Sequence, residues 1–293
     1  MAPRTQPSER QRRLGAELRK LRLRAGISGS RAAEILDADR ARISNIEAGR
    51  IDVSRNRLYK VLREYGCPDG PYFDALMEMA QSRGVGWWDE FRDVMRRQAL
   101  DLAEMESRAA SIRVHEPLAI PGMFQTEDYA HAVMQAVSPD MGPTDRFVQF
   151  RMARQRVLTC EAPLPYHAVI HEAALRVRVG GPQVMRKQLR KLIEVARLPN
   201  VTVQVFPFER GAYPAFSRPF VLFGGSTGEL DTVYLEHSLK IVFLGDGADV
   251  DDYSKMFERL SDLALDPVDP EAAPESHIGR DSLSLIQHAM YEL

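Results

Sequence analysis

A short polar run, Arg40-Ala-Arg-Ile-Ser-Asn-Ile46, has the residue types that recognise DNA bases. Arginine can form two hydrogen bonds with the major-groove edge of guanine, and asparagine can do the same with adenine. Ile43 and Ile46 are three residues apart, so on a helix they would share one buried face. The outward face would then carry Arg40, Ala41, Arg42, Ser44 and Asn45. The same spacing also fits an ordinary helical hairpin with a polar outer face.

Two short helices joined by a tight turn would position this run. The first helix is expected to begin near Ser28 or Ser30, and it carries small residues, Ala32 and Ala33, where two helices could touch. Asp39 stands where an N-cap residue should accept hydrogen bonds from the second helix, and Gly49 closes that helix. Together these features predict a helix-turn-helix, whose second helix enters the major groove.

The charge of the chain is distributed unevenly. Residues 1–65 hold 16 basic and 8 acidic residues, a net charge of +8, whereas the remaining residues hold 23 basic and 33 acidic residues, a net charge of −10. A basic segment on an acidic chain is the pattern expected when one domain binds a polyanion and the other does not. A solvated basic face with no ligand would have the same charge.

The wider pattern predicts two domains, an all-α helix-turn-helix domain over 1–82 and a mixed α+β domain over 83–293. Helical periodicity marks the region 8–25, where Leu14, Leu18 and Leu21 form one stripe. In the second domain the expected strands are 110–115, 166–170, 201–206, 216–223, 232–236 and 240–244. The expected helices there are about 87–106, 126–136, 143–158, 182–197, 249–265 and 282–291.

Longer motifs carry a resemblance to a known family. Arg13-Leu-Gly-Ala-Glu-Leu-Arg-Lys-Leu-Arg22 and Ile43-Ser-Asn-Ile-Glu-Ala-Gly-Arg50 resemble the Xre, or λ-repressor-like, helix-turn-helix. The second domain resembles an actinobacterial extension of such regulators that is described as antitoxin-like. The stretches that carry this second resemblance are 116–130, 151–156, 180–186 and 199–208.

The resemblance implies roles for individual residues of the first domain. Arg40, Ala41, Ser44 and Asn45 would face base edges. Ser28, Arg42 and Arg50 would hold phosphates, and Arg55 matches a loop position that can reach the minor groove. Three departures from the family pattern put the operator sequence in question: Gly29 replaces a common glutamine, Asp37 replaces the usual turn glycine, and Arg40-Ala41 replaces a frequent Gln-Ser pair. Asp37 can adopt the left-handed conformation better than most residues.

The second domain offers little that points to catalysis. His167 and His171 would share a helix face as a metal pair, but Ala168, Val169 and Ile170 favour a strand, which would place the two about 13 Å apart. Ser226 lacks the G-x-S-x-G setting of a catalytic serine, and Asp249 is expected to cap a helix. Cys67 and Cys160 lack metal-ligand spacing and are interpreted as free thiols in a reducing cytoplasm. We therefore expect no enzymatic activity, no metal and no cofactor.

One aromatic group of the second domain has the composition of a ligand or partner site. Tyr213, Phe216, Tyr234 and His237 could line an apolar pocket with a few polar tips. Packing in a hydrophobic core explains the same residues without a ligand.

The sequence as a whole predicts a cytoplasmic, sequence-specific DNA-binding transcriptional regulator. Its partners would be a palindromic double-stranded operator and a second copy of the chain, and its C-terminal domain would sense a ligand or a small protein encoded nearby. The alternative is an antitoxin-like interaction protein that neutralises a small partner and autoregulates its operon. No apolar run reaches the roughly 20 residues that a membrane span needs.

Overall fold

The computed structural model describes residues 6–82, 84–137, 144–213, 218–236, 240–269, 271 and 280–293. The chain forms two compact units. The head unit comprises Met1–Met105 together with Ser226–Leu230, and the body unit comprises Glu106–Gly225 and Asp231–Leu293. The division at Met105 differs from the expected boundary at 82/83, because residues 84–105 group by their contacts with the helices before them.

The head unit is built from helices. They are α1 (Glu9–Arg24), α2 (Gly29–Leu36), α3 (Arg40–Glu47), α4 (Arg55–Glu64), α5 (Pro71–Gln81), the 3-10 helix η1 (Trp87–Phe91), most of α6 (Arg97–Arg108) and the short η5 (Gly228–Leu230). The predicted helix over 8–25 is confirmed as α1, which starts with a capping box. The Ser8 hydroxyl accepts from the Gln11 amide at 3.2 Å, and the Gln11 side chain accepts from the Ser8 amide at 2.8 Å.

The core of the head unit forms where the apolar stripes of the first helices meet. Leu14, Leu18 and Leu21 of α1 are buried with Ile43 and Ile46 of α3, as the helical spacing predicts. Arg22 of α1 and Glu47 of α3 add an ion pair between the same helices, with Nε to Oε1 at 2.5 Å and Nη2 to Oε2 at 3.0 Å. Both side chains of the pair are 11% exposed, so α3 is fixed to α1 by apolar and charged contacts together.

The body unit contains one six-stranded sheet in the order β3-β2-β1-β4-β5-β6. The strands are β1 (Ser111–Glu116), β2 (Tyr166–His171), β3 (Val201–Phe206), β4 (Phe220–Gly224), β5 (Thr232–Glu236) and β6 (Ile241–Leu244). β1, β2 and β3 pair in parallel, and β4, β5 and β6 join them in antiparallel pairs. An all-helical N-terminal region followed by a mixed sheet with helices confirms the predicted α+β class.

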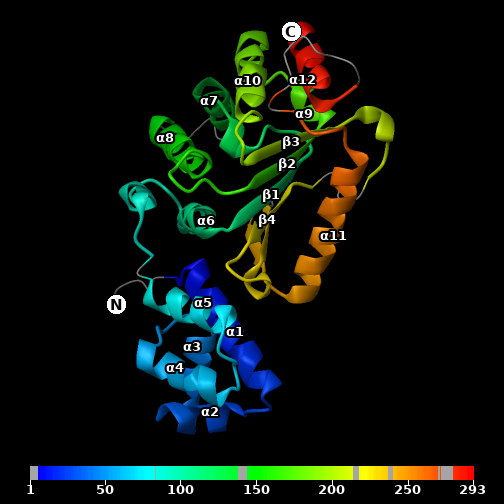
Figure 1. The fold of residues 1–293 in the computed structure, drawn as a ribbon. Helices are drawn as coiled ribbons and strands as arrows, with labels where there is room; N and C mark the ends of the chain where they lie inside the picture. The colour runs from blue at the N-terminus through cyan, green and yellow to red at the C-terminus, as the bar shows by residue number, and fades with distance from the viewer. Residues whose placement is uncertain are drawn as a thin grey trace. The chain divides into compact units, whose positions relative to one another are not determined.

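Helices cover both faces of the sheet (Figure 1). The helical elements of the body unit are η2 (Gly122–Phe124), α7 (Glu127–Val137), α8 (Asp145–Arg154), η3 (Gln155–Leu158), α9 (Glu172–Arg176), α10 (Pro182–Val195), η4 (Phe208–Arg210), α11 (Gly247–Leu263) and α12 (Ser282–Tyr291). α11 packs Phe257 and Leu260 against Val169, Leu222 and Val233 of the strands. We call this side of the sheet the α11 face; α7, α8 and α10 lie on the opposite side.

Strand register decides which side chains share a face. Because neighbouring side chains alternate along a strand, the pairs Ile112–Tyr166 and Val221–Tyr234 place both tyrosines opposite the α11 face. Glu116 shares that side, since it is four residues after Ile112 on β1. Polar side chains from β1, β2 and β5 therefore lie on one side of the sheet.

The N-cap residue predicted for α11 is wrong. Asp246, rather than Asp249, is the N-cap of α11, and its carboxylate accepts from the Ala248 amide at 3.0 Å. Asp249 lies in the first turn instead. Asp246 takes the cap because its backbone is extended directly before the first helical residue, whereas the backbone of Asp249 is already helical.

Candidate nucleic-acid interface

α2 and α3 form a helix-turn-helix whose ends are fixed by their own side chains. The Ser28 hydroxyl accepts from the Arg31 amide at 3.1 Å and caps α2. The Asp39 carboxylate accepts from the Arg42 amide at 2.6 Å and caps α3. Between them Asp37 ends α2 with φ +47°, the left-handed conformation. Within the described residues it is the one non-glycine residue with positive φ, so the aspartate takes the turn position usually held by glycine.

The outer face of α3 has the exposure that the sequence pattern predicts. Ile43 and Ile46 are buried beneath the helix, and Ala32 of α2 is fully buried at the helix contact. Arg40, Ala41 and Ser44 are exposed, and Asn45 is half-buried. These side chains are therefore available to a DNA groove, and their contacts with individual bases remain a prediction.

Asn45 and Arg50, expected to contact a base and a phosphate respectively, touch each other. Nη1 of Arg50 donates to Oδ1 of Asn45 at 3.4 Å. The amide nitrogen of Asn45 is left to donate elsewhere, and the guanidinium keeps most of its donors for a phosphate. Arg50 thus helps to orient the amide that would read a base.

Arg40 belongs to the outer face of α3 and also lies close to the first turn of α2, and both are expected to contact DNA. A Cβ added to Gly29 would come within 3.9 Å of Nε of Arg40, so the guanidinium stem lies over the first turn of α2. Ser28 caps that same turn, where free backbone N–H groups favour a phosphate. The absence of a long side chain at Gly29 therefore leaves this space to Arg40.

Arg42 and Arg55, the two remaining residues expected to contact the DNA backbone or minor groove, are also exposed. Arg42 lies in the first turn of α3, and Arg55 is the first residue of α4. Ser54, directly before it, has the extended backbone of an N-cap residue, so Arg55 stands where a loop meets a helix. The structure thus places Ser28, Arg42, Arg50 and Arg55 on the surface of the head unit without bringing all four together.

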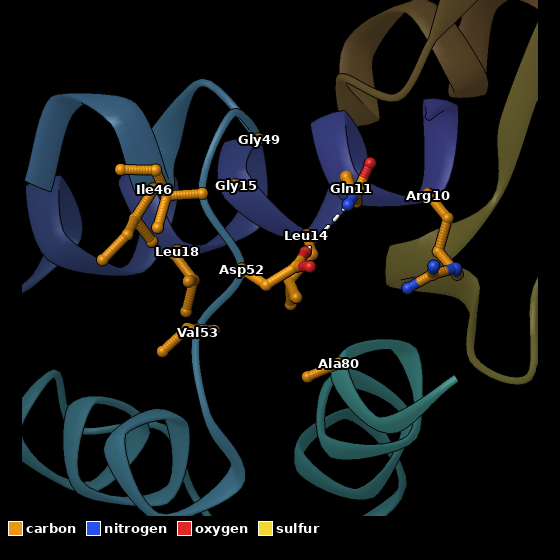
Figure 2. A pocket seen from close by; sticks show the side chains of 11 residues that line it. Arg10, Gln11, Leu14, Gly15, Leu18, Ile46, Gly49, Asp52, Val53 and Ala80 are labelled. Carbon is orange, nitrogen blue, oxygen red and sulfur yellow. Dashed lines mark hydrogen bonds between the residues drawn. The ribbon is translucent and has the colours of Figure 1, made fainter. Parts of the chain in front are cut away.

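The space beneath this interface is packed too tightly for a ligand. Figure 2 shows a pocket between α1, the end of α3 and the segment 51–53, lined in part by Leu14, Ile46 and Val53. Its volume is about 10 Å³, room for about one water molecule. A hydrogen bond from Nε2 of Gln11 to Oδ1 of Asp52, at 2.8 Å, ties α1 to that segment. The pocket therefore serves packing rather than ligand binding.

Sequence reasoning missed the contacts that hold α3 in place. Arg22 and Glu47 are 25 positions apart, and Gln11 and Asp52 are 41 apart, beyond the reach of any helical pattern. The signal available in the sequence was indirect: Arg22 and Glu47 both stand inside the two stretches that resemble the Xre head.

The structure does not gather the aromatic group expected in the second domain. Tyr213 packs edge-on against His115, with ring centres 5.5 Å apart, on the α11 face. Tyr234 packs against Phe223 and Phe243 on the other face, because it pairs with Val221 and the strand pleat turns it away. Phe216 and His237 lie outside the described residues. A common pocket for Tyr213 and Tyr234 is therefore ruled out by the sheet between them.

The two histidines considered as a metal pair are on a strand, as predicted. Both belong to β2, where Nε2 of His167 is 2.7 Å from the Gln204 side-chain oxygen and Nδ1 of His171 accepts from the Ala173 amide. Among the described residues, no three His, Cys, Asp or Glu side chains are grouped closely enough to hold a metal ion. In the same part of the chain, every helix is too short or too polar to span a bilayer.

Comparison with protein families divides the chain in a similar way. Residues 13–73 match a family model described as a helix-turn-helix domain, so the head unit is of a kind found in DNA-binding regulators. Neither the search of curated proteins nor the search of solved structures found a match. Residues 99–271, more than half of the chain, match the model described as domain of unknown function DUF5753. The chain therefore belongs to the DUF5753 family, with a helix-turn-helix domain at its N-terminus.

Proposed function

We propose that this protein is a sequence-specific transcriptional regulator of the Xre type that reads its operator with α3. The observation that carries the proposal is the exposed face of Arg40, Ala41, Ser44 and Asn45 above the buried Ile43 and Ile46. Arginine and asparagine at such positions can recognise guanine and adenine in the major groove. The net charge of +8 over residues 1–65 supports binding to a polyanion.

The proposed binding unit is a homodimer on a palindromic operator. Helix-turn-helix heads gain affinity and symmetry when two of them meet half-sites about 34–36 Å apart on one side of the duplex. A single eight-residue α3 contacts only a few base pairs, so one head alone would read a short and frequent sequence. The acidic remainder of the chain would stay off the DNA and would be free to join the two copies.

The proposed role of the body unit is to control the head, as the resemblance to antitoxin-like extensions implies. A ligand or a small protein could change operator affinity only through different affinities for two arrangements of the dimer. We assign no catalytic step to the chain, and its proposed place of action is the cytoplasm, where it would meet chromosomal DNA.

Selection of bound fragments from random and genomic DNA by the full-length protein tests the proposal. A two-fold symmetric motif should be enriched by the natural protein and by Arg63→Ala, which removes an exposed charge from α4 that pairs with Asp69. The same motif should be lost with Arg40→Ala/Asn45→Ala. No enriched motif, or the same motif from the double variant, would overturn the reading role of α3.

Co-purification separates the regulator from its interaction-protein alternative. A ligand-driven regulator should bind its operator as the purified chain alone. An antitoxin-like protein should instead be recovered with a small protein encoded beside it, and its operator affinity should depend on that protein.

A further inference from the structure

One pocket of the body unit is large enough for a small molecule. It lies between the end of α8, η3 and the C-terminal half of α10, next to η2, and its volume is about 280 Å³. We call it the α10 pocket. The residues that line it include Met123, Met152, Arg156, Leu158, Lys191 and Glu194. A cavity of about 150 Å³ holds benzene, so the α10 pocket has room for about eleven non-hydrogen atoms.

Three side-chain amides tie the walls of the α10 pocket to one another. Nε2 of Gln155, on η3, donates to the carbonyl oxygen of Gln125, directly after η2, at 2.8 Å. The fully buried Gln188 of α10 donates to the Phe124 carbonyl oxygen of η2 at 2.7 Å. Nδ2 of Asn200, which follows α10, donates to the carbonyl oxygen of the last residue of η3 at 3.2 Å. The pocket is therefore formed in the free protein, as ligand sites usually are.

The floor of the α10 pocket is apolar. Met123, Leu158 and Val195 line it and are buried, and the half-buried Met152 adds a second thioether. Methionine is unbranched and flexible, so a floor with two methionines can adjust to a flexible aliphatic chain. Burial of such a chain on this floor removes apolar surface from water. The floor therefore favours a ligand with an apolar body.

The rim of the α10 pocket is charged. Arg156 and Lys191 contribute two cations to it, and Glu194 contributes one carboxylate. Among the described residues, none of these three side chains has a hydrogen-bond or ion-pair partner. Because Lys191 is half-buried, a carboxylate beside its ammonium would be screened less than on the open surface. The rim can therefore receive one anionic group.

The two walls that carry this rim are a basic part of an otherwise acidic domain. Residues 144–160, which include α8 and η3, hold four basic residues and one acidic residue, and residues 182–198, which include α10, hold five and one. Together these two segments have a net charge of +7, whereas residues 66–293 as a whole have −10. Part of the positive charge is balanced within the domain, as in the ion pair of Arg154 with Glu106. The remainder attracts small anions to the α10 pocket.

We propose that the α10 pocket binds a medium-chain carboxylic acid. The aliphatic chain would lie over the methionine floor, and the carboxylate would bind Arg156 and Lys191. Room for about eleven non-hydrogen atoms corresponds to a chain of roughly eight to ten carbons. This inference rests on the proposed ligand-sensing role of the body unit and names the chemistry of the ligand. Binding is measured without DNA, so its failure is distinguishable from failure of the regulator proposal.

Isothermal titration calorimetry on the full-length protein, with sodium octanoate and sodium decanoate as probes, tests the pocket. Each acid should bind once per chain. Octanamide has the chain without the charge and should bind at least about fivefold more weakly than octanoate. Butanoate has the charge but lacks four of the carbons, and it should bind at least about tenfold more weakly.

Three single variants test the rim. Lys191→Gln should weaken octanoate binding by about fivefold, because one cation is lost beside the carboxylate. Arg190→Gln removes an exposed charge from the preceding position of the same helix, outside the pocket, and should change binding by less than about twofold. Glu194→Gln should instead strengthen binding about two- to threefold, because it removes a like charge from the rim. Misfolding cannot produce a gain of affinity, so Glu194→Gln is informative even if Lys191→Gln is unstable.

Three results would overturn the proposal: no heat from either acid up to about 5 mM, equal binding of octanoate and octanamide, or unchanged octanoate binding in both Lys191→Gln and Glu194→Gln. A small protein recovered with the natural chain but not with Lys191→Gln, together with no heat from the acids, would assign the pocket to that protein instead. Octanoate binding that leaves operator affinity unchanged would support the site and contradict its regulatory use.

Discussion

At the residue scale, the side chain expected to contact a base, Asn45, is hydrogen-bonded to the side chain expected to contact a phosphate, Arg50. Arg50 donates to the side-chain oxygen of Asn45 while both remain accessible on the head unit. An amide held by a neighbour loses less rotational freedom when it meets a base, because part of that freedom is already lost in the free protein. Specificity at the base pair that Asn45 contacts should therefore depend also on Arg50, which does not contact that base pair.

A double-mutant cycle on operator and random DNA checks this dependence. Asn45→Ala should cost roughly 1–3 kcal/mol on the operator and little on random DNA. Arg50→Ala should weaken binding to both, with a larger loss on the operator. In the Asn45→Ala background that extra loss should vanish, because the contact is already gone. Equal losses from Asn45→Ala on the two DNAs would refute its base-reading role.

Glu116 makes the stability of the body unit depend on pH. Its pKa rises from an ordinary 4.5 to about 8 in the folded chain, through burial first and the charge of Glu236 second, while Arg151 opposes the rise. Between these values the folded state binds more protons than the unfolded state, so the free energy of unfolding should fall as the pH rises. Glu116→Gln should make that fall shallower, as urea unfolding from pH 5 to pH 8 would measure. A variant as pH-dependent as the natural protein would show that Glu116 is not the group responsible.

At the element scale, the joint between α1 and α3 determines where α3 lies. Gly49 follows α3 with φ +70°, and a Cβ there would lie 2.7 Å from backbone atoms of Gln11 and Arg12. Gly66 follows α4 with nearly the same φ, +71°, but a Cβ there would meet nothing within 4 Å. An alanine at either glycine would have the same backbone strain, but only an alanine at Gly49 would also overlap with other atoms.

Alanine at these two glycines should have clearly different effects on stability. Gly66→Ala should lower the free energy of unfolding by about 1–2 kcal/mol, the cost of a left-handed alanine. Gly49→Ala should lower it by about 1–3 kcal/mol more, because α1 must also move away. Urea unfolding curves of the two variants give the comparison, and a similar loss in both would mean that the approach of α1 to α3 adds no constraint.

At the scale of the whole molecule, the separation of charge should confine DNA binding to one part of the chain. Residues 1–65 carry a net charge of +8 and the remainder −10, so attraction to phosphates comes from the N-terminal region. The salt dependence of binding then counts the phosphate contacts of that region alone.

Arg42→Gln tests contact number and dimer state together. If each protomer places Arg42 on one phosphate, the slope of log affinity against log salt should fall by about 0.9 for a monomer and about 1.8 for a dimer on two half-sites. Arg63→Gln, which removes a charge already paired with Asp69, should leave the slope unchanged. Titrations of the operator at several salt concentrations supply the slopes. An unchanged slope with Arg42→Gln would show that Arg42 does not contact a phosphate.

Local features of the fold could be predicted because they depend on a few neighbouring residues. The capped ends at Ser28 and Asp39 and the left-handed Asp37 follow from residue type and spacing within one or two helical turns. The six strands were expected near their observed places for the same reason, apolar runs between turn residues. The shift of the α11 cap from Asp249 to Asp246 shows the limit of such reasoning, since several acidic residues near a helix start compete for one position.

The element types, the helix-turn-helix and its outward residues follow from the order of the amino acids, because caps and amphipathic spacing act over a few residues. Which distant side chains meet follows from the packing of the folded chain. It joined Arg22 to Glu47 and placed Tyr213 and Tyr234 on opposite faces of a sheet. Such contacts depend on strand order and helix packing, which minimise exposed apolar surface over the whole chain and leave no local signature.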